Sequence, residues 1–183
     1  MKSLPFIIFG LTVIAQWAAS LSQIWTHENV LSKGEVIRVK CTAPDPYDPL
    51  RGRFLAVRPE QNRFKLPSET NITRGTSIYC TLTPGADGLH TISDVTASPP
   101  KTGTYLKATA GWIYEKEMSI EWPFDRYYLN EKLAPEADKW FAENIRTAKG
   151  IVAEARVLGG RAVLTDLTLD GRSFRELLKE RQK

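Results

Sequence analysis

The most informative stretch of the chain reads IVAEARVLGGRAVLTDLTL and spans residues 151–169. Apolar and polar side chains alternate on both sides of Gly159-Gly160, which is the period of a β-strand with one buried face. Two glycines between such segments are typical of a β-hairpin with a tight turn. We therefore expect antiparallel strands over 151–158 and 161–169.

The same two-residue period recurs upstream and gives eight strand candidates in all. The other six are residues 35–41, 53–58, 76–83, 89–95, 104–112 and 118–124. In 104–112 the period predicts that Leu106, Ala108, Ala110 and Trp112 share one face. Turn residues at 84–88 and Asp170-Gly171 separate neighbouring candidates. The pattern predicts a mainly β fold, an antiparallel sandwich or a small barrel, the latter leaving no exposed edges.

One amphipathic helix interrupts the strands over residues 133–149. Its apolar positions fall at helical spacing, and Pro135 suits its first turn. We expect this helix to cover an open end or face of the sheet, with a partner-binding helix as the alternative.

The N-terminus predicts a membrane helix in front of the β domain. Lys2 precedes an uncharged run over 4–21, whose eighteen residues would span about 27 Å as a helix. The run is interpreted as an uncleaved signal anchor over 1–28, with Lys2 in the cytoplasm and Glu28 onward exported. The alternative is a signal peptide cleaved at Ala18-Ala19-Ser20.

The remaining chain is divided into an exported β-rich domain over 29–172 and a basic tail over 173–183. Hydrophobic residues make up 42% of the 183 residues and charged residues 25%, which excludes a disordered or multi-span membrane protein. Five basic and two acidic residues lie in 172–183 and supply most of the net charge of +4. We expect a solvated terminal helix there. Export and the lack of a basic-aromatic stripe argue against nucleic acid as a partner.

Two cysteines lie in different strand candidates. Cys41 shares a face with Ile37 and Val39, and Cys80 shares a face with Ile78 and Leu82, so that both thiols are expected to point into one core. If the two strands are neighbours, the geometry permits a disulfide between Cys41 and Cys80, and an oxidising compartment favours it. The alternative is two separate buried thiols.

The first candidate binding site is the proline-rich segment APDPYDPLRGRF over 43–54. Its prolines stiffen the backbone, and Gly52 permits an unusual entry into the next strand. The charged and aromatic residues of this candidate site are Asp45, Asp48, Arg51, Arg53 and Phe54. Either the aspartates lock the loop through backbone and arginine contacts, or the rigid loop carries a ligand or partner.

The second candidate binding site is the cluster of Arg126, Tyr127 and Tyr128. These side chains could form the edge of a groove, or they could pack in the core with Arg126 paired to a carboxylate. No catalytic residue, metal or cofactor is expected. Arginines beside Asp45 and Asp48 favour two ionised carboxylates rather than an acid–base pair, and neither histidine has partners at ligand spacing.

Three stretches of this chain resemble the GDYXXLXY family of bacterial membrane-anchored proteins. They are APDPYDPLRGRFLAV (43–57), DRYYLNE (125–131) and RAVLTDLTLDG (161–171), and the resemblance covers roughly residues 4–173. In the naming motif Gly52 matches, whereas Arg53, Phe54, Val57 and Pro59 stand where Asp, Tyr, Leu and Tyr are usual. The resemblance implies an anchored, exported domain and supplies no mechanism.

Together these inferences predict a single-pass protein of the bacterial inner membrane with its C-terminal domain in the periplasm. Its partners are expected to be the lipid bilayer, through the N-terminal helix, and another membrane or envelope protein. The expected role is that of an accessory or binding module, not an enzyme. The alternative is a periplasmic enzyme that acts on envelope polymers through Asp45, Asp48 or Glu131.

Overall fold

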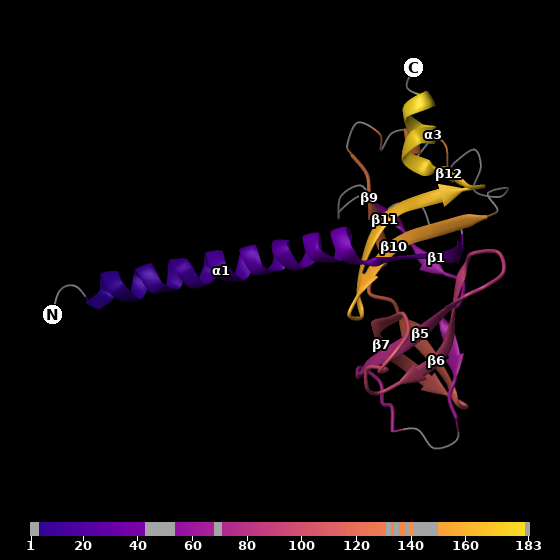
Figure 1. The fold of residues 1–183 in the computed structure, drawn as a ribbon, viewed down its shortest axis with the longest axis horizontal. Helices are drawn as coiled ribbons and strands as arrows, with labels where there is room; N and C mark the ends of the chain where they lie inside the picture. The colour runs from indigo at the N-terminus through magenta and orange to yellow at the C-terminus, as the bar shows by residue number, and fades with distance from the viewer. Residues whose placement is uncertain are drawn as a thin grey trace.

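In the part of the chain that the structure describes, the strands form two five-stranded antiparallel sheets and a two-stranded ribbon, and a long helix leads into them (Figure 1). The computed structural model describes residues 4–42, 54–67, 71–130, 133, 136, 137, 140 and 150–181. The elements are α1 (Leu4–Lys33), β1 (Glu35–Thr42), β2 (Phe54–Ala56), β3 (Arg58–Pro59), β4 (Arg63–Lys65), β5 (Ser77–Pro84), β6 (His90–Thr96), β7 (Tyr105–Tyr114), β8 (Glu117–Glu121), β9 (Arg126–Tyr128), β10 (Ile151–Leu158), β11 (Arg161–Leu169), β12 (Arg172–Ser173) and α3 (Phe174–Arg181).

The first sheet has the order β12-β11-β10-β1-β3 and contains the expected hairpin. β10 and β11 pair antiparallel across Gly159 and Gly160, whose φ values are 55° and 81°. Positive φ at both central residues is the geometry of a type I′ turn, which glycine adopts without steric cost. Asp170 (φ 47°) and Gly171 (φ 81°) repeat this geometry between β11 and β12. The predicted hairpin is confirmed.

The second sheet has the order β4-β8-β7-β5-β6. Alternate residues of β7 are buried as far as Ala110, as the two-residue period predicts. The pairing with β8 then shifts register between Ala110 and Ile113, and Trp112 is 43% exposed. The prediction that Trp112 faces the core is wrong, because a bulge moves every later side chain to the opposite face.

The two sheets approach each other at one corner, so that the assembly nearly closes. Leu106 of β7 forms a parallel bridge with Gly160, and the backbone N–H of Lys107 donates to the carbonyl of Gly160 at 2.7 Å. A Cβ at Gly160 would lie 2.8 Å from the ring of Tyr105. Glycine is therefore required at this position both for its φ and for the close approach of the two sheets.

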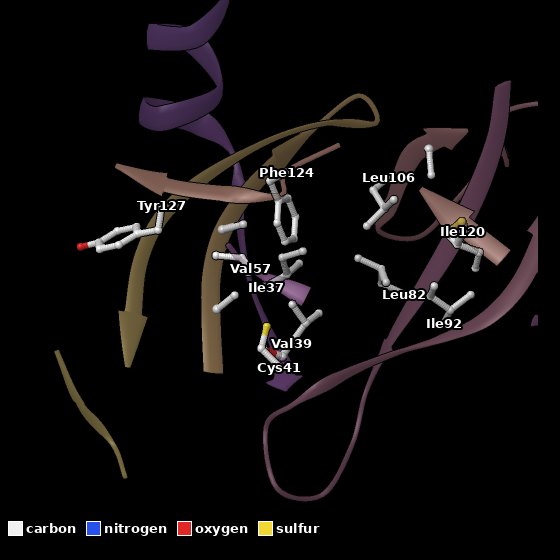
Figure 2. Packing of buried hydrophobic residues seen from close by; sticks show 14 of the residues in the cluster. Ile37, Val39, Cys41, Val57, Leu82, Ile92, Leu106, Ile120, Phe124 and Tyr127 are labelled. Carbon is white, nitrogen blue, oxygen red and sulfur yellow. The ribbon is translucent and has the colours of Figure 1, made fainter. Parts of the chain in front are cut away.

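One apolar core fills the space between the sheets (Figure 2). Ile37 of the first sheet and Ile78, Leu106 and Met118 of the second are fully buried. Burial of each such side chain contributes roughly 1.5–3 kcal/mol relative to exposure. The expected mainly β, antiparallel fold is confirmed.

The helix α1 extends away from the β domain for most of its length (Figure 1). Its thirty residues span about 45 Å at ~1.5 Å per residue. In the described part of the chain, one helix is long and apolar enough to cross a membrane, and it covers Phe6–Lys33. Near its C-terminal end Val30 is buried, where α1 contacts β10 and β11.

The C-terminal segment forms α3, which packs against the β domain. Phe174 and Leu178 are fully buried, and the ring of Trp140 lies edge-on to Phe174 with centroids 5.5 Å apart. The expectation of a solvated terminal helix is therefore wrong for the face of α3 that carries Phe174 and Leu178. The period of the segment did not distinguish a docked helix from a solvated one, because that difference depends on the surface available to receive Phe174 and Leu178.

Four residues of the expected helix over 133–149 are described. Glu136, Ala137 and Trp140 are helical, and the backbone N–H of Ala137 donates to the carbonyl of Leu133 at 3.0 Å. Leu133 and Ala137 are buried in the core. The other residues of this predicted helix lie outside the described residues.

Candidate functional site

The ribbon of β2 and β9 pairs the last residue of the first candidate binding site with the second candidate site. Phe54 pairs with Tyr128, Leu55 with Tyr127 and Ala56 with Arg126. β2 begins at Phe54, the last residue of the proline-rich segment, so this end of the segment lies beside the Arg126–Tyr128 cluster. Of the first candidate site, only the backbone of Phe54 is described, as the start of β2. The other residues of that site, Asp45, Asp48, Arg51, Gly52 and Arg53, lie outside the described part of the chain, as does Glu131.

Tyr127 anchors the ribbon to the first sheet. The residue is buried, and its hydroxyl donates a hydrogen bond to Oδ1 of Asp166 on β11 at 2.9 Å. Figure 2 shows the hydroxyl directed away from the apolar side chains of the core. The same Oδ1 accepts the backbone N–H of Leu167 at 2.9 Å, and the Arg175 guanidinium lies 5.9 Å from the ring centroid of Tyr127.

These surroundings keep the phenol of Tyr127 protonated. Burial, followed by the hydrogen bond to the Asp166 carboxylate, raises the pKa of Tyr127 to about 12, and Arg175 opposes this shift. A neutral phenol is a good hydrogen-bond donor and a poor acid or base near neutral pH. Tyr127 is therefore suited to hold β9 in place.

Arg126 and Tyr128 lie on the opposite face of β9 from Tyr127, since side chains alternate along a strand. Tyr128 is 66% exposed and Arg126 is partly buried, with Nε of Arg126 3.5 Å from Oδ2 of Asp125. The structure thus divides the cluster: Tyr127 packs in the core, and Tyr128 faces outward. The sequence leaves these two arrangements open as alternatives for the whole cluster.

A cavity of about 410 Å³ adjoins the ribbon. Its walls include Val57 and Arg58, which follow β2, and Phe124 and Asp125, which precede β9. The backbone N–H of Val57 donates to the carbonyl of Asp125 at 2.7 Å, so the ribbon pairing continues along this wall. The candidate functional site therefore consists of an outward aromatic and cationic face beside a hollow.

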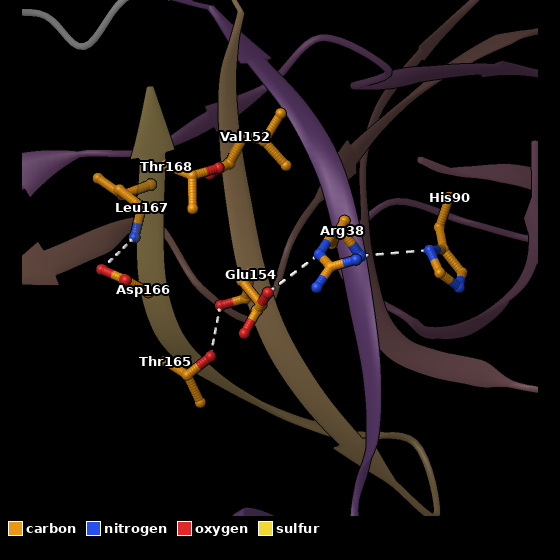
Figure 3. A network of polar contacts seen from close by, with 8 residues as sticks. All are labelled: Arg38, His90, Val152, Glu154, Thr165, Asp166, Leu167 and Thr168. Atoms are coloured by element: carbon orange, nitrogen blue, oxygen red, sulfur yellow. Dashed lines mark hydrogen bonds and ion pairs between the residues drawn. The ribbon is translucent and has the colours of Figure 1, made fainter. Parts of the chain in front are cut away.

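A network of polar contacts links the two sheets (Figure 3). Nε of Arg38 on β1 contacts Oε2 of Glu154 on β10 at 3.0 Å, and the backbone N–H of Arg38 donates to Nδ1 of His90 on β6 at 3.2 Å. Nδ1 of His90 is thus the acceptor in this contact between the two sheets. Among the residues that the structure describes, no three of His, Cys, Asp and Glu are grouped closely enough to hold a metal ion.

Cys41 and Cys80 are both buried free thiols in the shared core. Cys41 lies on β1 of the first sheet and Cys80 on β5 of the second. Their strands are therefore not neighbours, and the possible disulfide depended on that condition. Burial raises the pKa of each thiol to about 12. Neither thiol is suited to act as a nucleophile near neutral pH, because the thiolate is the reactive form.

Sequence reasoning missed the roles of Asp166 and Arg175 at this site. Asp166 is the one charged residue in AVLTDLTL (162–169), and a carboxylate among apolar and hydroxyl-bearing residues of a strand is a signal for a buried partner. Arg175 lies in the segment interpreted as a basic tail. The other missed feature is a hollow of about 430 Å³ where α1 meets the β domain.

Comparison with known proteins identifies one family. The family model described as GDYXXLXY protein matches residues 16–167, most of the chain. No curated protein matches the chain. No solved structure matches it either.

Proposed function

The chain belongs to the GDYXXLXY family, and on this basis we propose that it is a single-pass, membrane-anchored binding module. Its helix α1 holds the β domain at the periplasmic surface of the inner membrane. The outward face of the β2–β9 ribbon contacts a neighbouring membrane or envelope protein.

Membrane anchoring is supported by the surface of α1. Phe9, Ile14, Trp17 and Ile24 are large apolar side chains, all more than half exposed on this helix. Water would solvate such a continuous apolar surface poorly, whereas lipid chains solvate it well. The periplasmic orientation is supported by Lys2, since basic residues that flank a membrane helix favour the cytoplasmic side.

The observation that carries the binding role is the exposed side chain of Tyr128 next to Arg126 on a firmly held strand. Tyrosine and arginine are, with tryptophan, the residue types enriched in interface hot spots. The hydrogen bond between Tyr127 and Asp166 holds the inward face of β9 against the first sheet. Little conformational entropy of this strand is therefore lost when a partner binds to its outward face. The cavity beside Asp125 provides a concave surface for an anchoring side chain.

The proposal is tested by crosslinking in native membranes, with recovery of partner proteins from wild type and variants. We expect Tyr128→Ala and Arg126→Ala to lower the recovery of one partner. Tyr114→Ala is the matched control, since Tyr114 is another exposed tyrosine, on β7 of the second sheet. Equal recovery from wild type and all three variants would refute the role of the ribbon.

A further inference from the structure

A second hollow lies where α1 joins the β domain. Its volume is about 430 Å³, and it lies between the C-terminal turns of the helix and the corner at which β7 meets the turn of β10 and β11. The helix contributes Ser22, Gln23, Thr26, His27 and Val30. The β domain contributes Lys107, Pro123, Gly160, Arg161, Ala162 and Val163.

The charged side chains that line this hollow are both cationic. Lys107 and Arg161 are exposed, and neither makes an ion pair with any residue in the described part of the chain. The lining, as far as the structure describes it, contains no carboxylate. The hydrogen bond from the Lys107 backbone to Gly160 holds the two strands together, so both cations are kept at one place.

The position of the hollow along α1 corresponds to the surface of a bilayer. The uncharged residues 4–21 span about 27 Å as a helix, close to the ~30 Å thickness of a hydrocarbon core. Residues 22–27, which begin the lining, occupy about the next 9 Å along the helix. This length overlaps the headgroup layer, which is roughly 5–8 Å thick on each side of the core.

We propose that this hollow binds the phosphate of an anionic phospholipid headgroup. The guanidinium of Arg161 can donate two parallel hydrogen bonds to phosphate oxygens, and the ammonium of Lys107 supplies a second positive charge. The amide of Gln23, on the helix wall, provides a further donor. This inference rests on the proposed anchoring by α1, and it assigns the hollow a role in fixing the β domain against the membrane surface.

The test uses the full chain, purified in a neutral detergent and titrated while native mass spectrometry counts bound molecules. The probes are dioctanoyl phosphatidylglycerol, dioctanoyl phosphatidylcholine and inorganic phosphate. We expect one phosphatidylglycerol to bind per chain and to bind more tightly than the other two probes. The double variant Lys107→Gln/Arg161→Gln should weaken this binding by at least about tenfold, since each charge-assisted contact removed is worth about that factor.

The double variant Lys65→Gln/Lys179→Gln is the matched control. It removes the same charge from exposed positions on β4 and α3 that do not line the hollow, and it should bind phosphatidylglycerol like wild type. The inference is refuted if the two double variants bind equally. It is also refuted if inorganic phosphate or phosphatidylcholine binds as tightly as phosphatidylglycerol.

The intact mass of the purified chain separates this inference from the proposed function. A mass that corresponds to a chain cleaved after Ser20 would refute the anchor and, with it, both proposals. An intact chain that binds no phosphatidylglycerol would refute only the assignment of the hollow.

Discussion

The apolar residues of α1 and those of the β domain are of the same types and have opposite exposures. Ile14 on α1 is 65% exposed, whereas Ile37 on β1 is completely buried. The β domain removes its apolar surface from water by pairing two sheets, and α1 leaves its own apolar surface uncovered along nearly its whole length. The β domain is organised around its own core, whereas α1 is long and apolar enough to cross a membrane.

The largest expected effect contrasts two phenylalanines. Phe174 is fully buried and Phe9 is 69% exposed. Phe174→Ala should lower the free energy of unfolding of the β domain by about 3–5 kcal/mol, through lost burial and a cavity. Phe9→Ala should leave it unchanged. Urea denaturation in detergent measures both values, and an equal loss from both variants would contradict the contrast.

The next effect tests lipid as the solvent of α1. Ile14→Lys should disfavour insertion of the helix by about 2.5–3.5 kcal/mol, because a charge near the middle of a membrane helix is costly. We expect carbonate extraction to release more of this variant from membranes than of wild type. Ser32→Lys, at an exposed position near the C-terminal end of α1, is the control and should stay in the membrane fraction. Release of both variants alike would contradict a membrane-spanning role.

A smaller effect is expected at a polar group inside the β domain, because a buried hydroxyl needs a hydrogen-bond partner. The apolar surface of α1 has no such requirement. Tyr127→Phe removes the hydroxyl that donates to Asp166 and should lower the free energy of unfolding by about 1–2 kcal/mol. Tyr128→Phe, at an exposed hydroxyl, should change it little.

This difference should depend on pH. The pKa of Tyr127 is about 12 in the folded state, above the ordinary value of 10.0. The raised value means that folding favours the neutral phenol, so its stabilising contribution is full below about pH 10 and is lost as the pH rises toward about 12. Wild type and Tyr127→Phe should therefore converge in stability over this interval. A gap that stays constant from pH 9 to pH 12 would contradict this account.

The last expected effect, of about the same size as that at Tyr127, contrasts two glycines. A Cβ at Gly160 would meet the Tyr105 ring in a backbone with φ 81°, whereas a Cβ at Gly10 on α1 meets nothing within 4 Å. Gly160→Ala should cost about 1–2 kcal/mol from the left-handed backbone alone. Gly10→Ala should leave the unfolding midpoint of the β domain unchanged. Thermal unfolding in detergent measures both, and tolerance of Gly160→Ala would show that the corner between the sheets can relax.

Parts of the fold that depend on neighbouring residues could be predicted from the sequence. The β10–β11 hairpin followed from two glycines between alternating segments, and the buried faces around Cys41 and Cys80 followed from the two-residue period. The outward orientation of the Trp112 side chain could not be predicted, because the bulge that causes it depends on how β7 pairs with β8. The docking of α3 likewise depends on a surface formed by distant residues.

The candidate site shows the same limit. The sequence indicated Arg126, Tyr127 and Tyr128 as a group, but the partner of Tyr127 is Asp166, 39 residues away along the chain. Pairing of β2 with β9 brings the end of the proline-rich segment to this group. The alternation of the strand implied that Tyr127 and Tyr128 face opposite ways, and only the packing shows which of them faces inward.

By itself the sequence determined the family, the mainly β architecture, the turns and an N-terminal helix long and apolar enough for a membrane. The tertiary structure alone decided that Phe54, at the end of the proline-rich segment, pairs with Tyr128. It also decided that Phe174 and Leu178 complete the core and that Lys107 and Arg161 line one hollow. The physical reason is that periodicity and turn chemistry act over a few residues. Register, sheet closure and the position of charges depend instead on packing between segments that are far apart in the chain.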